Sequence, residues 1–327
     1  MPLTKLQFRA GINRETTSYT NEGGWYDGDK VRFQAGTPEK IGGWQKISGS
    51  SFLGTSRALH PFVALQGNRY MGNGTHLKYY VEEGGGYNDI TPIREETSAG
   101  AVTFSATSGS STLTVTDTDH GCIVNDFVTY TDAVSLGGTI TAVVLNQEYQ
   151  VSAVGSVDQY QIVARTVAIV PNITVDGTYT PTPVVANASD TGNGGSSTQG
   201  AYQVNTGLDT TVSGTGWGAG TWGRLGWGFG SSLIAFGDTL RIWTHDNFGE
   251  DLLINVRDGG IFYWDESTAT QSAPYSRAVA LSDLAGVDDT APTIAKQVMV
   301  SDRDRHILVF GCDPQDNIGV QDPLLIR

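Results

Sequence analysis

Two groups of side chains have the residue types of a metal-binding site. Each gathers polar ligand groups within a few positions of the chain: Asp117, Asp119 and His120 in the first, and Asp313, Asp316 and Asn317 in the second. The first could ligate a metal ion, and the oxygen atoms of the second could hold Ca²⁺. Neither has the spacing of a standard metal-binding loop. We interpret both as polar turn residues and predict no metal site.

The chain has two cysteines, Cys122 and Cys312, which lie far apart in the sequence. Neither has a partner at metal-ligand spacing, so we interpret both as buried, inert thiols. Nucleophile elbows, Walker loops, zincin helices and EF-hand loops are missing. A GxGxG run over residues 216–220 lacks the strand-to-helix context of a dinucleotide site. The sequence therefore predicts no catalytic residue, no cofactor and no enzymatic activity.

Composition points to an all-β chain. Gly accounts for 42 of the 327 residues, and Thr, Val and Tyr are frequent, as in sheets with many turns. The formal charge is −14 and Lys and Arg do not cluster, which argues against a surface that grips nucleic acid. No apolar run reaches the roughly 18 residues of a membrane span. The first residues lack the apolar core of a signal peptide, which predicts folding in a cytoplasm.

Residues 233–265 carry the clearest repeat unit. Four short strands are predicted, at residues 233–236, 240–243, 251–255 and 260–264. Gly237-Asp238 ends the first, a polar break at residues 245–250 follows the second, and Asp258-Gly259 marks a tight hairpin before the fourth. Four antiparallel strands in about 40 residues match one blade of a β-propeller.

Two other segments share this pattern of a strand, a Gly/Asp/Asn turn and a second strand. They are residues 62–92 and residues 295–311. A blade must stack on other blades, so we predict a β-propeller; a β-sandwich or mixed barrel uses the same alternation and remains the alternative. A propeller needs about four blades and three are recognised. Either the chain is a fragment, or another chain completes the ring.

The middle of the chain has a different composition. Residues 97–200 are rich in Ser and Thr, and Arg165 is the one Lys or Arg between positions 95 and 223. We predict an inserted small β-sandwich or barrel domain here, with a flexible Gly/Ser linker at residues 189–198 as its exit. The predicted fold is thus all-β and propeller-like, with an N-terminal propeller part (1–96), the insert (97–200) and a propeller continuation (201–327) that is truncated.

A Trp-Gly run follows the insert, over residues 214–230. Indole rings could stack on bases or sugars. Because Arg224 is the one cation nearby, we favour packing between loops or blades.

The N-terminal segment LTKLQFRAGINRETTSYTNEGGWYDGDKVRFQAGTPEKIGGWQKI resembles the opening of a group of tailed-phage virion proteins. So do AYQVNTGLDTTVSGTGWGAGTWGRLGWG, WTHDNFGEDLLINVRDGGIFYWD and VSDRDRHILVFGCDPQDNIGVQDPLLIR. The group comprises tail tubular and packaged-DNA stabilisation proteins, among them the β-propeller nozzle subunits of short-tailed phages. The resemblance covers residues 1–95 and 200–327. Related chains continue past the position where this one ends, which supports the fragment interpretation.

The resemblance implies a ring-shaped homo-oligomer, usually a hexamer, located in the tail of the virion and assembled in the host cytoplasm. Its implied partners are the portal and adaptor ring on one side and the tail tip or fibres on the other. Genomic DNA would pass through the bore as cargo. An acidic bore repels a duplex rather than capturing it. The expected acidic contributors are turn residues such as Asp246, Glu250, Asp251 and Asp258.

Two other functions stay open. Residues 258–263 partly resemble the Asp-box turn of sialidase-type propellers, which makes a glycan depolymerase one alternative. That turn is structural in those enzymes, and no pair of carboxylates flanking a sugar site can be identified here. The other alternative is a receptor-binding or adhesive tail protein that acts through the insert.

Overall fold

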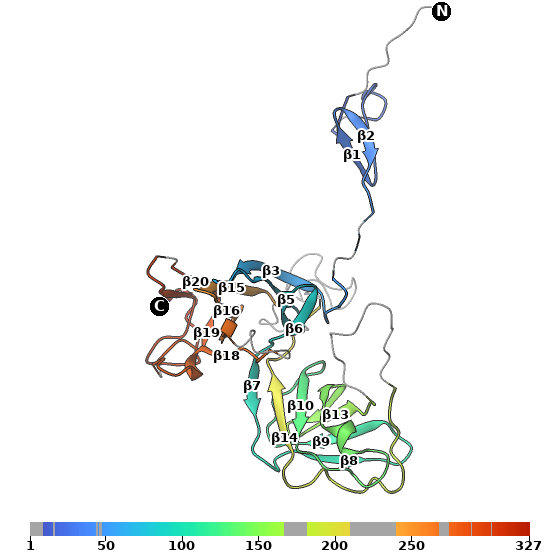
Figure 1. Ribbon diagram of the computed structural model, residues 1–327, viewed down its shortest axis with the longest axis vertical. Coiled ribbons are helices and arrows are strands. Elements are labelled where there is room, and N and C mark those ends of the chain that lie inside the picture. The colour runs from blue at the N-terminus through green and yellow to red at the C-terminus, as the bar shows by residue number, and fades with distance from the viewer. Residues whose placement is uncertain are drawn as a thin grey trace, which may run out of the picture. The chain divides into compact units, whose positions relative to one another are not determined.

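The computed structural model describes residues 9–15, 17–43, 45, 48–166, 182–209, 240–267, 275–288, 290–301 and 303–327. In this part of the chain nearly all regular structure is antiparallel β-sheet, with a short helix, α1 (Ala142–Leu145), and a 3₁₀ turn at Leu281–Asp283. The chain divides into two units, Met1–Ile47 and Ser48–Arg327 (Figure 1). No helix in the described segments is long and apolar enough to cross a membrane.

The first unit is built on a hairpin of β1 (Val31–Gln34) and β2 (Thr37–Lys40). Its two-residue turn, Ala35-Gly36, has positive φ at both positions, 48° and 84°. A turn of this kind follows the right-handed twist of the two strands.

The second unit begins with a four-stranded antiparallel sheet in the order β3-β4-β5-β6. Its strands are β3 (Ser56–Val63), β4 (Arg69–Thr75), β5 (Tyr79–Glu83) and β6 (Gly86–Asp89). The structure confirms the blade-like meander predicted for residues 62–92.

A second sheet has the order β15-β16-β17-β18, with β19 paired to β17 as well. Its strands are β15 (Trp243–Phe248), β16 (Asp251–Val256), β17 (Gly259–Trp264), β18 (Val279–Ala280) and β19 (Ile294–Ala295). The hairpin between β16 and β17 is confirmed, although its two-residue turn is Arg257-Asp258, one position earlier than predicted, with φ of 57° at Asp258. The strand predicted at residues 233–236 lies outside the described residues.

The polar break predicted at residues 245–250 is wrong, because β15 continues to Phe248. The strand predicted at 240–243 correspondingly starts only at Trp243. Polar side chains persist in β15 because a neighbouring strand uses them. The Thr244 hydroxyl accepts a hydrogen bond from the Val298 amide (3.3 Å), and the Asp246 carboxylate accepts one from the Val300 amide (2.8 Å).

A hairpin of β20 (Gln297–Val300) and β21 (Ile307–Phe310) forms a third sheet, as predicted for residues 295–311. The last residues pair with it: Val309 and Arg327 exchange backbone hydrogen bonds of 2.7 and 2.9 Å. The chain is therefore all-β and propeller-like in its sheets. The buried side chains of the first two sheets form one core that includes Tyr79, Trp243 and Trp264.

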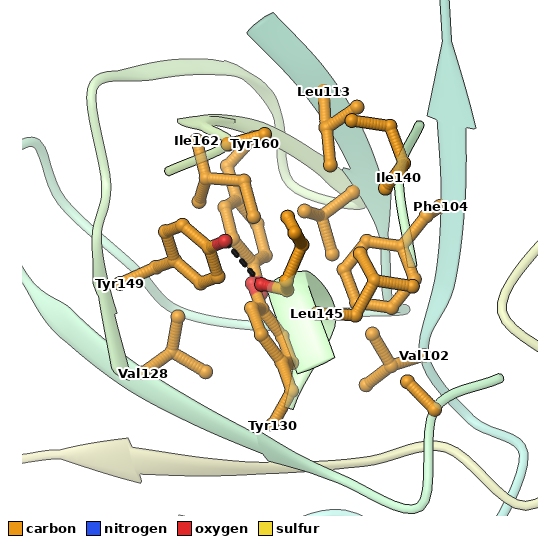
Figure 2. Close-up of a cluster of buried hydrophobic side chains, with 14 of the residues drawn as sticks. Val102, Phe104, Leu113, Val128, Tyr130, Ile140, Leu145, Tyr149, Tyr160 and Ile162 are labelled. Carbon is orange, nitrogen blue, oxygen red and sulfur yellow. Dashed lines mark hydrogen bonds between the residues drawn. The ribbon is translucent and has the colours of Figure 1, made fainter. Parts of the chain in front are cut away.

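The middle region contains two four-stranded antiparallel sheets, β11-β10-β14-β7 and β12-β13-β9-β8. The strands are β7 (Ile93–Glu96), β8 (Thr103–Ala106), β9 (Thr112–Thr116), β10 (Phe127–Thr131), β11 (Glu148–Gln150), β12 (Ala153–Ser156), β13 (Gln159–Val163) and β14 (Gln199–Gln203). Both sheets contribute to one core, shown in Figure 2. The chain enters through β7 and leaves through β14, which pair with each other. The division at residues 96 and 200 stays a prediction.

The flexible linker predicted at residues 189–198 is wrong. Asp190 is buried, and its carboxylate accepts hydrogen bonds from the amides of Gly138 (2.9 Å) and Ile140 (2.9 Å). A Cβ added at Gly192 would lie 2.9 Å from the Leu136 carbonyl oxygen. The glycine here permits close backbone packing, so this segment packs against the loop that contains Leu136.

Candidate functional site

A buried charged cluster lies where the first sheet meets the middle region. At its centre is Lys78, in the turn between β4 and β5, whose side chain is fully buried. The turn is closed by the Thr75 amide, which donates to the Lys78 carbonyl, and by the Lys78 amide, which donates to the Thr75 hydroxyl, both at 2.8 Å. The backbone of this turn thus fixes the position from which the Lys78 side chain extends.

Three charged side chains from distant parts of the chain complete the cluster. Lys78 Nζ lies 2.6 Å from Asp89 Oδ2 and 2.6 Å from Glu148 Oε1. The Arg277 guanidinium pairs with Asp89 and lies 3.3 Å from Glu148 Oε2, which also accepts from Gln203 Nε2 at 2.7 Å. We call Lys78, Asp89, Glu148 and Arg277 the junction network. It joins the first sheet, the middle region and the segment before β18.

In the junction network, opposite charges outweigh the effect of burial on the pKa values of Asp89 and Arg277. Burial alone would raise the pKa of Asp89, but the positive charges of Lys78 and Arg277 prevail and hold it below its ordinary value. Burial would lower the pKa of Arg277, but the charges of Asp89 and Glu148 prevail and raise it. Two cations therefore match two anions, as buried charges require. Lys78 Nζ also lies 4.4 Å from the centre of the Phe127 ring.

Both carboxylates of the junction network are occupied by cations, so neither is a free acid or base. What the arrangement can do is fix the middle region on the first sheet. Removing one partner would leave an uncompensated buried charge, which costs about 3–5 kcal/mol.

A second cluster pairs tyrosines with carboxylates between the first two sheets. The Tyr70 hydroxyl donates to Glu266 Oε1 at 2.9 Å, and the Tyr275 hydroxyl donates to Glu83. The Trp264 ring packs on both tyrosines, at 6.1 and 5.9 Å between centroids. Burial raises the pKa of Tyr70 to about 12, with Glu266 adding to the effect. These phenols are therefore protonated hydrogen-bond donors at neutral pH, whereas a nucleophile needs a lowered pKa.

A histidine pair lies between β3 and β15. The His60 and His245 rings are 4.6 Å apart; His60 Nε2 lies 2.7 Å from Asn247 Oδ1 and His245 Nδ1 lies 3.1 Å from the Tyr79 hydroxyl. Burial, followed by the charge of His60, lowers the pKa of His245 to about 4. His245 is therefore neutral at pH 7 and supports the contact between the two sheets.

The first group with metal-ligand residue types, Asp117, Asp119 and His120, is engaged in turns and in the core. Asp117 accepts from the Tyr202 hydroxyl at 2.6 Å, and His120 Nδ1 accepts from the Cys122 amide at 2.9 Å. Asp119 is exposed and has φ of 56°. Among the described residues, no group of three or more His, Cys, Asp and Glu side chains could hold a metal ion.

The second group, Asp313, Asp316 and Asn317, also consists of a buried aspartate that accepts hydrogen bonds and of exposed residues. The Asp313 carboxylate accepts hydrogen bonds from the Thr293 amide (3.0 Å) and the Gly319 amide (2.8 Å). It therefore links two loops. Asp316 and Asn317 are exposed.

Both cysteines are buried free thiols. Burial raises the pKa of Cys122 to about 12 and also raises the pKa of Cys312. Because the thiolate is the reactive form, neither is poised as a nucleophile. The Trp-Gly run and the GxGxG run lie outside the described residues.

The expected acidic contributors to a channel lie in strands as well as in turns. Asp246 and Asp251 belong to β15 and β16, and Asp251 accepts a hydrogen bond from the Tyr263 hydroxyl. Which residues line a channel stays a prediction.

The junction network was not found from the sequence. Its members are separated by up to 199 positions, from Lys78 to Arg277. The available signal was a lysine next to the apolar strand Tyr79-Tyr80-Val81, a place where a cation needs a buried partner.

No protein-family model matches the sequence, and no curated protein matches it. A comparison with solved structures finds the phage phi92 endosialidase, at 12% sequence identity and a TM-score of 0.22, over 84% of this chain and 36% of that chain. This chain thus spans about a third of the length of the structure it matches.

The prediction that the chain is not an enzyme is contradicted by this finding, because the protein found is by its name an enzyme. An identity of 12% and a TM-score of 0.22 assign neither a substrate nor catalytic residues to this chain.

Proposed function

We propose that this chain is a structural protein of a phage tail, which forms the ring-shaped nozzle or hub around the DNA exit channel. The observation that carries the proposal is the junction network. It fixes the middle region on the propeller-like sheets with four matched, buried charges. The resemblance of residues 1–95 and 200–327 to tail tubular proteins supports the same function. A part that holds back a packaged genome needs such fixed contacts.

In this proposal the ring is a homo-oligomer, a hexamer, that connects the portal and adaptor to the tail tip or fibres. DNA passes through it as cargo. The charge of −14 supports this role, because a duplex is repelled by an acidic surface and slides past it.

A direct test is the location of the chain in purified virions. Gold-labelled antibodies against the protein should bind at the tail of negatively stained particles, and mass spectrometry should detect the chain in particles that survive density-gradient purification. Detection in infected cells but never in particles would overturn the proposal.

A receptor-binding role of the middle region is the second candidate. Large apolar side chains are exposed on it, with Val143 76% and Val157 69% accessible. Purified full chain should then compete with phage adsorption, and the Val143→Asp/Val157→Asp variant should not. A glycan depolymerase would instead release new reducing ends from host surface polysaccharide incubated with the chain.

A further inference from the structure

The junction network holds an amine and a carboxyl group that are placed to react with each other. β5 and β6 pair antiparallel, with Tyr80 opposite Asp89. Lys78 lies two positions before Tyr80, so its side chain is on the same face of the sheet and is a diagonal neighbour of Asp89. Lys78 Nζ lies 2.6 Å from Asp89 Oδ2, and the lysine side chain is fully buried. This placement meets the geometric requirement for formation of an amide bond.

The two carboxyl oxygens of Asp89 have different surroundings. Oδ1 accepts hydrogen bonds from the Thr91 amide (2.9 Å) and the Thr91 hydroxyl (2.6 Å), and it also pairs with the Arg277 guanidinium. Oδ2 faces Lys78. When an amine attacks a carboxyl carbon, one oxygen gains negative charge and the other leaves. The three donors at Oδ1 stabilise that charge, as in an oxyanion hole, so Oδ2 is the leaving oxygen.

Glu148 is placed to carry a proton between the reacting atoms. Its Oε1 lies 2.6 Å from Lys78 Nζ, whereas its Oε2 accepts from Gln203 at 2.7 Å and lies 3.3 Å from Arg277. The ring of Phe127 lies against Nζ, 4.4 Å from it to the ring centre. A carboxylate in contact with the amine can take a proton from the nitrogen and return it to the leaving oxygen.

We propose that Lys78 and Asp89 are joined by an amide bond in the folded protein. Lys78 gives one proton to Asp89 Oδ2, which produces an amine and a carboxylic acid. The amine nitrogen then bonds to Asp89 Cγ, and a second proton passes from the nitrogen to Glu148. Glu148 returns this proton to Oδ2 as the bond between Cγ and Oδ2 breaks. The products are one amide and one water molecule, and no oxidant, reductant or external reactant is consumed.

The surroundings of Asp89 set the pace of this reaction. In the ion-paired state both carboxylates are occupied, so the reaction starts only when a proton moves from Lys78 to Asp89. Burial raises the pKa of Asp89, whereas the charges of Lys78 and Arg277 lower it below its ordinary value. The acid form is therefore the minor one, and the bond forms slowly. Burial favours the uncharged amine and acid that react, and it keeps solvent away from the finished amide.

The product keeps the buried charges matched. Lys78 and Asp89 become one neutral amide, whose N–H can donate to Glu148, and Glu148 and Arg277 remain as one anion and one cation. The bond closes a ring from the turn before β5 to the end of β6. A cross-link of this kind stabilises a protein mainly by restricting its unfolded chain. The inference concerns a single chain and holds whether or not the chain forms a ring.

The test is the intact mass of the denatured full chain. The parent should be lighter than its sequence by one water molecule, and a parent of full sequence mass would overturn the inference. Lys78→Arg keeps a positive charge beside both carboxylates but lacks the amine, so it should have its full mass while its circular dichroism matches the parent. Exposed Lys40→Arg is the matched control and should show the same loss of water as the parent.

Glu148→Gln tests the proton carrier separately. The glutamine keeps the size of the side chain but cannot accept the proton, so this variant should also have its full mass. Loss of water in Glu148→Gln at the extent seen in the parent would refute the role of Glu148.

A tryptic digest of the parent locates the bond. Trypsin does not cut after an acylated lysine, so residues 70–94 should appear as one peptide, one water lighter than its sequence, in place of 70–78 and 79–94. A bond to Glu148 would instead join residues 70–94 to residues 95–165 and would overturn the assignment to Asp89. Loss of water with normal cleavage after Lys78 would place the dehydration elsewhere and would overturn the inference.

Discussion

Replacing Lys78 by Met tests the junction network most sharply. Methionine keeps most of the side-chain length but removes the charge, so Asp89 and Glu148 would share Arg277 as their one cation. Lys78 is fully buried, and water cannot replace it without opening the contact. Loss of one partner from a buried ion pair costs about 3–5 kcal/mol. At about 2 °C per kcal/mol for a unit of this size, the melting temperature should fall by about 6–10 °C.

The assay is differential scanning calorimetry at pH 7, with exposed Lys40→Met as the matched control, which should leave the melting temperature within about 1 °C of the parent. The double variant Lys78→Met/Glu148→Gln should be less destabilised than the sum of its single variants, because neither lost charge then leaves an unpaired partner. A decrease in melting temperature of less than about 2 °C for Lys78→Met would refute the reasoning. Strict additivity of the two single variants in the double variant would refute it as well.

Three further outcomes are expected. Because the pKa of His245 is lowered to about 4, the folded state binds fewer protons than the unfolded state between about pH 6.5 and 4; stability should therefore fall on acidification through this window, and urea titrations of His245→Gln should show a weaker fall. Asp190→Ala removes the acceptor of several loop amides and should cost about 1–3 kcal/mol and open residues 189–198 to limited proteolysis, whereas a flexible linker would be cut equally in the parent. Tyr160→Phe breaks hydrogen bonds of 2.7 and 2.9 Å to Tyr130 and Tyr202 and should cost about 1–3 kcal/mol in chemical denaturation, with unchanged stability as the contrary result.

The strand pattern could be predicted where apolar runs alternate with Gly and Asp turns. The first sheet is such a case, and so is the hairpin between β16 and β17. Local sequence failed where a distant strand or loop supplied the hydrogen-bond partner. Asp246 is stable inside β15 because β20 donates to it, and Asp190 is fixed by a loop about 50 positions earlier.

The junction network could not be predicted for the same reason. A lysine beside an apolar strand signals a buried partner, but nothing in the sequence says that the partners are Asp89 and Glu148. Pairings over such distances depend on how whole sheets pack. The turn assignment of the Asp313 group could be made locally only for the Gly319 amide, six positions later, because an aspartate that accepts from a nearby amide is a common turn feature. The Thr293 amide lies 20 positions earlier, and nothing in the local sequence indicates that contact.

The central claim, a ring of this chain in a phage tail, is tested most directly by electron cryo-microscopy of intact virions. The account predicts density for several symmetric copies around the DNA exit channel, each with its middle region seated on the propeller-like sheets through Lys78 and Glu148. A tail without this chain, or a chain bound as a single peripheral copy away from the channel, would contradict it.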